Sequence, residues 1–278
     1  VIQMFYIIEG QDIRNSGWNH LSSSSFLTLS FYFKTTKTGT SKLPIMFRTR
    51  HGTNYYYVKN VTVTDPTNWN RYTVTIPGNS NIQIDDANTV GMDINFTYYS
   101  GPDKDTSSEG SWGSTNAYST SDSTNYFDST SNDMFITGIQ LESGDTATSF
   151  EHRSYGDELQ RCQRYCYAAV ADGSIDNYAP LAIGRFYNAS DAQFNIFFPV
   201  TMRYPPTLDS ATTAAGTFFY NTNGGFGGVE ATTIALNERA YNSATVYTQG
   251  ASGQTAGNGT TLYSHDTEVA KLVFTAEL

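Results

Sequence analysis

Six aromatic residues have the types and spacing to bind sugars. Flat aromatic faces stack on the C–H faces of sugar rings, while neighbouring amide and carboxylate groups hydrogen-bond the hydroxyls. Tyr55 and Tyr57 share one face of a predicted strand, because side chains alternate along a strand. Tyr98 and Tyr99 lead directly into a long polar loop that carries Trp112. The predicted glycan-binding candidates are Trp18, Tyr55, Tyr57, Tyr98, Tyr99 and Trp112.

An alternative interpretation of these aromatic residues stays open. Large aromatic side chains are enriched in strands, and they often lie in a core or at an interface. Trp69 in particular is expected to be a core residue. The region from Tyr98 to Trp112 is the best candidate for a ligand contact, because it joins a strand to a long loop.

Signals for catalysis are missing from the sequence. It contains no G-x-S-x-G, P-loop or H-E-x-x-H motif. Asp85 and Asp86 are adjacent, so on a strand they would face opposite sides and could not act as a catalytic pair. His152 lies between Glu151 and Arg153, which favours a polar network over a general base. We predict no catalytic residue, no enzymatic activity and no cofactor.

The sequence also predicts no metal site. Asp103 and Asp105 resemble the start of a calcium loop, but Ser108 and Ser114 stand where a glycine and a glutamate are required. Cys162 and Cys166 are four residues apart, a helical spacing that rarely reaches disulfide geometry. A zinc site would need two more ligands at motif spacing. We therefore expect both cysteines to be buried structural thiols.

Composition and charge exclude several classes of partner. The 278 residues carry a net charge of −10, and the 16 Lys and Arg residues are scattered. Nucleic acid and anionic membrane surfaces are bound by clustered basic residues, so neither is an expected partner. No apolar run approaches the roughly 20 residues that span a bilayer, so no membrane insertion is predicted. The 20 Tyr and 17 Phe residues favour strands over helices.

The elements that would position these residues are mostly strands. Alternating segments separated by turns predict strands throughout, and the polar stretch 100–125 is too long for an ordinary hairpin. Residues 154–166 form the one convincing helix, with Ser154 as its N-cap and Tyr155, Leu159, Cys162 and Cys166 on one apolar stripe. The predicted fold is all-β, with two β-sandwich, jelly-roll-like domains joined by this short amphipathic helix.

The predicted domain organisation has three parts. Residues 1–153 form a jelly roll, residues 154–167 a linker helix, and residues 168–278 a C-terminal β-sandwich. The first strand begins at Val1 without a preceding turn, so we expect N-terminal strands to be missing from the sequence.

One segment resembles a known family. Residues 136–165, ITGIQLESGDTATSFEHRSYGDELQRCQRY, are similar to a segment that recurs in virion fibre proteins of tailed phages. In those proteins it closes a jelly roll similar to carbohydrate-binding modules, so the resemblance implies such a domain for residues 1–153. Nearly every fixed position of that pattern is matched, and Ser149 departs where a proline is common. The likeness covers most of the chain, through residues 8–12, 28–33, 69, 72–78, 112, 198–206 and 274–278.

The resemblance implies a non-enzymatic component of a virion appendage, on the tail or the capsid. The implied partners are two further copies of the chain in a homotrimer, other virion proteins and a host cell-surface polysaccharide. Two alternatives stay open. One is a purely structural tail-fibre or capsid-fibre component without receptor binding. The other is a polysaccharide depolymerase, which would need a pair of carboxylates in a cleft.

Overall fold

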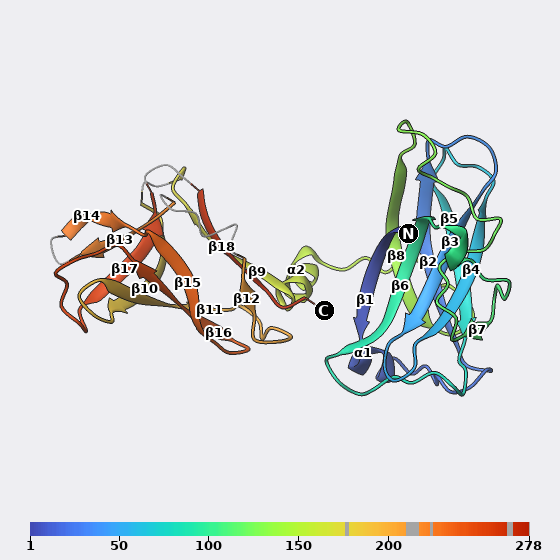
Figure 1. The fold of residues 1–278 in the computed structure, drawn as a ribbon, viewed down its shortest axis with the longest axis horizontal. Coiled ribbons are helices and arrows are strands. Elements are labelled where there is room, and N and C mark those ends of the chain that lie inside the picture. Colours follow the sequence, from blue (N-terminus) through green and yellow to red (C-terminus); the bar gives the residue numbers. More distant parts are fainter. Residues whose placement is uncertain (176–177, 210–216, 223–224, 266–268, 278) are drawn as a thin grey trace. The chain divides into compact units, whose positions relative to one another are not determined.

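The protein consists of two β-sandwich units, as predicted. The computed structural model describes residues 1–175, 178–209, 217–222, 225–265 and 269–277. Contacts between Cα atoms divide the chain into a first unit, Val1–His152, and a second unit, Arg153–Glu277. Figure 1 shows both units as layers of strands. The all-β fold class is confirmed.

The first unit contains two antiparallel sheets. The five-stranded sheet has the order β1-β6-β3-β4-β7, and the three-stranded sheet has the order β5-β2-β8. The elements are β1 (Ile2–Glu9), α1 (Gly10–Arg14), β2 (Phe26–Thr35), β3 (Ser41–Thr49), β4 (Tyr55–Val63), β5 (Asn70–Pro77), β6 (Val90–Tyr99), the 3₁₀ helix η1 (Pro102–Lys104), β7 (Trp112–Gly113) and β8 (Met134–Ser143).

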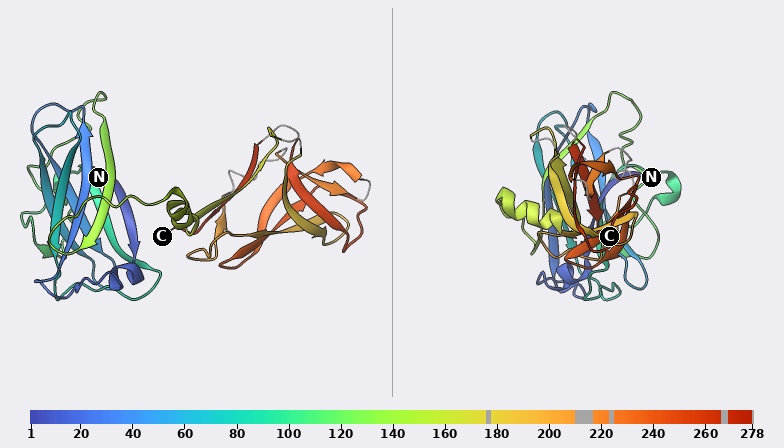
Figure 2. Two further views of the ribbon diagram at one scale, coloured as in Figure 1. Left: turned by 180° about the vertical axis from the view of Figure 1, so that it is seen from behind. Right: turned by 90° about the vertical axis from the view of Figure 1, so that its left-hand side faces the viewer.

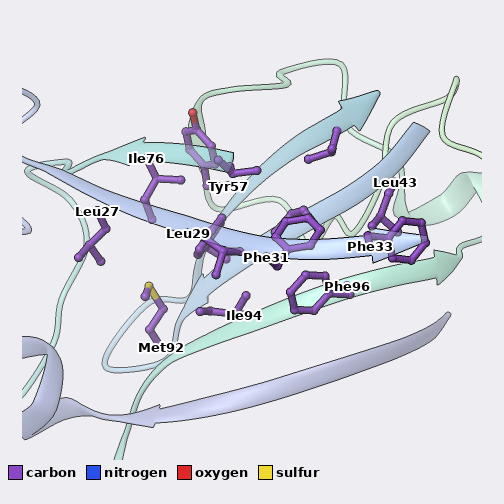
Figure 3. Packing of buried hydrophobic residues seen from close by; sticks show 14 of the residues in the cluster. Leu27, Leu29, Phe31, Phe33, Leu43, Tyr57, Ile76, Met92, Ile94 and Phe96 are labelled. Atoms are coloured by element: carbon purple, nitrogen blue, oxygen red, sulfur yellow. The ribbon is translucent and has the colours of Figure 1, made fainter. Parts of the chain in front are cut away.

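The two sheets enclose one hydrophobic core. Alternation along β2 and β6 turns every second side chain toward this core, where rings and branched side chains from both sheets interlock. Phe31 of β2 meets Phe96 of β6 edge to face, with ring centroids 5.0 Å apart. Figure 3 shows the core side chains of β2, β3 and β6 between the sheets. The opposite face of β6 is therefore free to carry polar residues.

A glycine marks the irregular point in the three-stranded sheet. The pairing of β2 with β8 shifts register between Ser30 and Tyr32. Gly138 lies at this shift with a φ of +58°, a conformation that side chains with a Cβ rarely adopt. A Cβ at this position would lie 2.9 Å from Cδ2 of Tyr32.

The second unit is a sandwich of a large and a small sheet (Figures 1 and 2). Their orders are β14-β13-β17-β10-β11-β16-β15 and β12-β18-β9. The elements are α2 (Tyr155–Gln163), β9 (Cys166–Asp172), β10 (Pro180–Phe186), β11 (Asp191–Phe197), β12 (Thr207–Leu208), β13 (Phe218–Thr222), β14 (Gly225–Glu230), β15 (Thr233–Arg239), β16 (Ser243–Gln249), β17 (Gly259–Ser264) and β18 (Val269–Thr275).

Helix α2 begins as the sequence predicts, but its apolar stripe does not pack into a core. The Oγ atom of Ser154 accepts a hydrogen bond from the backbone N–H of Asp157 at 3.2 Å, which confirms the N-cap. The expectation of buried thiols is wrong, because Cys162 and Cys166 are both exposed. The helix ends at Gln163 and not at Cys166 as predicted, so Cys166 is the first residue of β9 and lies outside the helical stripe. The helix buries none of its residues. No described helix is long and apolar enough to span a membrane.

Candidate ligand pocket in the first unit

Three of the predicted aromatic candidates belong to the core of the first unit. Trp18, Tyr57 and Tyr98 expose only 4%, 5% and 9% of their surface. The indole N–H of Trp18 donates to the Ser25 carbonyl at 3.1 Å. Burial raises the pKa of the phenols of Tyr57 and Tyr98. Rings that are enclosed in this way present no face on which a sugar could stack.

Two further candidates are held at the edge of the same core. Tyr55 and Trp112 are partly buried and pack against the core cluster. The indole N–H of Trp112 donates to the Pro77 carbonyl at 2.7 Å, and its ring lies 5.4 Å from that of Tyr57. Trp112 thus anchors the long loop onto β4. Tyr99 differs from the other five candidates, because it is 40% exposed and stands on the opposite face of β6 from Tyr98.

Tyr99 lines a polar pocket of about 230 Å³. The pocket lies where the ends of β3 and β6 meet the long loop 100–125. Its lining consists almost entirely of hydroxyl, amide and carboxylate side chains with two prolines: Pro44, Thr97, Tyr99, Ser100, Pro102, Asp105, Ser119, Thr120, Ser121, Ser123, Thr124 and Asn125. The structure therefore brings the predicted region around Tyr99 together with a set of small polar side chains.

Hydrogen bonds between distant segments hold the loop over this face. Lys42 and Thr124 form two hydrogen bonds. The Lys42 N–H donates to Thr124 Oγ1 at 2.8 Å, and the Thr124 N–H donates to the Lys42 carbonyl at 3.0 Å. The Tyr126 N–H donates to the Tyr98 carbonyl at 2.9 Å. These bonds attach the end of the loop to β3 and β6, so the pocket wall has a fixed backbone.

A side-chain network stiffens the other wall of the pocket. The Asn60 amide donates to Thr120 Oγ1 at 2.6 Å, and Thr120 Oγ1 donates to Asp122 at 2.6 Å. The Ser119 hydroxyl donates to Oδ1 of Asp105 at 2.6 Å. This hydrogen bond to Oδ1 orients the Asp105 carboxylate, while its second oxygen has no partner among the described residues. That oxygen can accept a hydrogen bond from a ligand hydroxyl.

Unpartnered polar atoms lie beneath the pocket. Thr97 is completely buried, and its Oγ1 atom has no hydrogen-bond partner among the described residues. Gln3 pairs with Thr97 across β1 and β6, and its Oε1 atom is also buried and unpartnered. Oδ1 of Asn95, two residues earlier on the same face of β6, shares this state. Buried polar groups without partners are costly, so a water molecule held beside these atoms would stabilise the fold.

The charges around the pocket are paired or negative. Lys42 and Asp122 form an ion pair, and their hydrogen bond raises the pKa of the Lys42 ammonium and lowers the pKa of the Asp122 carboxyl. Asp105 is the one charged side chain among the described residues that line the pocket. The pocket can therefore donate and accept hydrogen bonds, and it offers no cation to a ligand.

A buried ion pair lies farther along the same face of the sheet. Asp93 is fully buried, and its Oδ2 atom accepts from Nε of Arg48 at 2.7 Å. Nη1 of Arg50 lies 3.6 Å from Oδ1 of Asp93. Two arginines share this one carboxylate, so the cluster carries a net charge of +1, and neither arginine belongs to the pocket lining.

Trp69 contradicts the prediction that it is a core residue. It is 45% exposed, and Nζ of Lys34 lies 5.0 Å from its ring centroid. The same ammonium lies 5.1 Å from the ring of Phe135. This arrangement is a cation–π contact on the outer face of the three-stranded sheet. Trp69 follows a turn and immediately precedes β5, so the alternation of β5 does not extend to it.

The second unit has a larger but chemically different groove. A cavity of about 460 Å³ is lined mainly by apolar residues of β9, β10 and β11. Ile183 and Phe197 are 78% and 74% exposed there. Asn195 and the phenol of Tyr167 are the polar side-chain groups among the described residues that line it, and backbone atoms add further polar surface. The exposed apolar side chains of this groove can contact an apolar partner.

The pocket residues other than Tyr99 were not predicted from the sequence. Their signal was the alternation of β6, in which core residues at 92, 94, 96 and 98 interleave with Asp93, Asn95, Thr97 and Tyr99. A strand that is polar on one face and apolar on the other indicates a sheet with a functional or solvated outer face. The loop residues carry no comparable signal, because their contacts are distant in sequence.

Comparisons with known proteins supply no family. No protein-family model matches the chain, and no curated protein matches it. Among solved structures, the chain is similar to wild-type discoidin II from Dictyostelium discoideum with a TM-score of 0.20 and 10% identity, over 100% of this chain and 94% of that one. A native structure of recombinant discoidin II gives 0.19 and 11%, over 92% and 76%. At these TM-scores neither likeness carries an argument about function.

Proposed function

We propose that this chain is a non-enzymatic, glycan-binding component of a tailed-phage virion fibre, and that it contacts a host cell-surface polysaccharide through the pocket of the first unit. The observation that carries the glycan part is the pocket itself. Small hydroxyl and amide side chains surround the exposed ring of Tyr99. Sugar hydroxyls match such groups, and sugar C–H faces match such a ring.

The pocket's chemistry favours binding over catalysis. Hydrolysis of a glycosidic bond requires two carboxyl groups on either side of the bond. Among the described residues that line the pocket, Asp105 alone has a carboxylate. A depolymerase would thus lack its second group at this site, and we place this alternative last.

The virion assignment rests on the sequence segment 136–165 and its likeness to phage fibre proteins. We propose a homotrimer on the same basis, together with contacts to other virion proteins. Exposed apolar side chains of the second unit, among them Ile183 and Phe197, are the kind of surface that subunit contacts cover. Sedimentation equilibrium of the purified chain tests the trimer, and a monomer at micromolar concentration contradicts it.

A structural fibre component without receptor binding is the second candidate. The apolar groove of the second unit favours it, since a surface of that kind suits assembly. Binding experiments distinguish the two candidates. If the chain is only structural, the purified protein binds neither host cells nor any glycan on an array.

The test of glycan binding uses two tyrosine variants. Tyr99→Ala removes the exposed ring of the pocket, and Tyr155→Ala removes an 80% exposed ring from α2 as a matched control. We expect Tyr99→Ala to weaken binding by roughly tenfold, the equivalent of one stacked aromatic contact of about 1.4 kcal/mol. Equal binding by both variants places the contact outside this pocket.

A further inference from the structure

We infer that the pocket selects an uncharged sugar residue, a hexose or N-acetylhexosamine, and that Asp105 excludes sugars that carry a carboxylate. This inference rests on the proposed function, because it specifies the substrate class of the same site. It is carried by the charges, the free hydrogen-bonding atoms and the size of the pocket. Each of these points to one neutral residue of a glycan.

The pocket's volume fits a single sugar residue. The pocket has a volume of about 230 Å³. Pockets for larger organic ligands run from about 300 to 1,000 Å³. A monosaccharide unit can enter this space, while the remainder of a polysaccharide chain must lie outside it. The exposed ring of Tyr99 belongs to the pocket lining and can contact that unit.

The free polar atoms of the pocket suit hydroxyl groups. The second oxygen of Asp105 is a strong acceptor, and the hydroxyls of Tyr99 and Ser121 make no hydrogen bond to the described residues. A hydroxyl both donates and accepts, so the hydroxyls of Tyr99 and Ser121 can accept from the O–H of a sugar hydroxyl or donate to its oxygen. The carboxylate of an acidic sugar can only accept hydrogen bonds. It therefore cannot donate one to the carboxylate of Asp105, and the two acceptors would face each other.

The surrounding charges oppose an anionic ligand. Acidic sugars are bound most strongly by arginine or lysine in charge-assisted hydrogen bonds. The two lysines that flank the pocket are each matched by a carboxylate, Lys42 by Asp122 and Lys104 by Asp103. Asp105 has no such counter-ion among the described residues, so it leaves an excess of one negative charge. A carboxylate within about 5 Å of it would be repelled.

Asp105→Asn is the variant that isolates this effect. Asparagine has the same shape, and its Oδ1 atom can keep the hydrogen bond from Ser119. The change removes the negative charge without altering the volume of the pocket. Asp86→Asn serves as the matched control, because Asp86 is exposed and lies outside the pocket lining.

The experiment measures binding of the purified full chain to two sets of immobilised polysaccharides at low ionic strength. The neutral probes are mannan, dextran and galactan, and the acidic probes, in which every sugar carries a carboxylate, are polygalacturonate, alginate and polysialic acid. We expect at least one neutral probe to bind, and every acidic probe to bind at least about tenfold more weakly. Asp105→Asn should reduce this preference severalfold, and Asp86→Asn should leave it unchanged.

The outcomes separate this inference from the proposed function. Binding to an acidic probe that Tyr99→Ala abolishes overturns the inference, yet it supports glycan binding at this pocket. An unchanged preference in Asp105→Asn also overturns the inference. If the wild-type chain binds no probe and no host cell, the proposed function itself fails.

Discussion

Replacing Thr97 with valine should make the first unit more stable. Valine has the shape of threonine with a methyl group in place of the hydroxyl, and both residues favour strands. Thr97 is completely buried, and its hydroxyl has no partner among the described residues. A buried unpaired polar group costs about 1 to 3 kcal/mol. We expect Thr97→Val to raise the free energy of unfolding by about 1 to 2 kcal/mol, since a water molecule offsets part of that cost.

Tryptophan fluorescence during urea unfolding measures this change in the first unit alone. All three tryptophans, Trp18, Trp69 and Trp112, lie within Val1–His152. With a urea dependence of about 2 kcal/mol per molar, the unfolding midpoint should rise by about 0.5 to 1 M. Thr73→Val on β5 is the matched control, because Thr73 is exposed and should change stability by less than about 0.5 kcal/mol.

The same substitution should weaken glycan binding. Because Thr97 is completely buried, a ligand can reach its hydroxyl only through a bridging water. Losing that contact corresponds to about 0.5 to 1.5 kcal/mol, or roughly a threefold to tenfold loss of affinity. A more stable protein that binds less well would identify Thr97 as a residue kept for function. A less stable Thr97→Val protein would refute the reasoning, because it would mean that the hydroxyl is satisfied in the folded chain. Unchanged affinity would remove Thr97 from the site.

Three further substitutions test other parts of the first unit by the same fluorescence assay. Burial raises the pKa of Tyr126 to about 12, so the unfolded chain loses this proton first, and stability should fall by about 2 to 3 kcal/mol as pH rises from about 10 to 12. Tyr126→Phe should remove the contribution of Tyr126 to that dependence, while buried Tyr57 and Tyr98 keep theirs. It should also cost about 1 kcal/mol at pH 7, because it leaves the Ser41 hydroxyl without its 2.9 Å partner; an unchanged alkaline profile contradicts this. Gly138→Ala should destabilise the first unit by about 1 to 2 kcal/mol, because the residue has a positive φ and its new Cβ would contact a tyrosine ring. Gly113→Ala is the control and should be neutral, because no atom lies within 4 Å of the added Cβ. Equal effects of the two substitutions would disprove the strain at Gly138. Asp93→Asn should cost about 2 to 3 kcal/mol, because it leaves two arginines without their buried counter-ion, and a neutral result would show that the pair contributes little.

The strand pattern predicts the fold well and also decides which aromatic residues are free. The alternation that puts Phe96 in the core also puts Tyr98 there, because both have the same parity on β6. Tyr99 has the parity of Thr97, and it is the candidate that reaches the pocket. Both Tyr98 and Tyr99 are candidates by aromatic type alone. Their even and odd positions along β6 place them on opposite faces of the sheet and so separate them. Tyr98 was thus distinguishable in principle from Tyr99 by the sequence alone.

The pocket walls could not be predicted from the sequence, because their contacts are not local. Lys42 and Thr124 are 82 residues apart in the chain, and Asn60 and Thr120 are 60 residues apart. Serine and threonine hydroxyls bond many different partners, so no spacing rule selects these pairs. A polar loop of this length can be recognised as a candidate for function, but its folded course depends on the sheet beneath it.

Helix α2 shows the corresponding limit for an apolar pattern. Periodicity correctly predicts the helix and its cap at Ser154, and it also predicts a stripe that requires cover. It does not say whether that cover belongs to the same chain. Leu159 and both cysteines are exposed in the chain as described. Burial of the thiols was predicted from the general tendency of free cysteine to pack as a small hydrophobe, and that tendency does not decide the position of an individual cysteine.

The two units differ in what their surfaces can bind, and this difference makes the competing functions separable. The first unit has a polar pocket above a row of unpartnered polar atoms, which destabilise the fold unless water or a ligand satisfies them. The second unit exposes apolar side chains such as Ile183 and Phe197, which favour contact with protein. Loss of glycan binding in Thr97→Val with an unchanged oligomeric state would therefore assign recognition to the first unit. If Thr97→Val lost both glycan binding and the oligomeric state, the loss of binding would follow from failed assembly and not from the pocket itself.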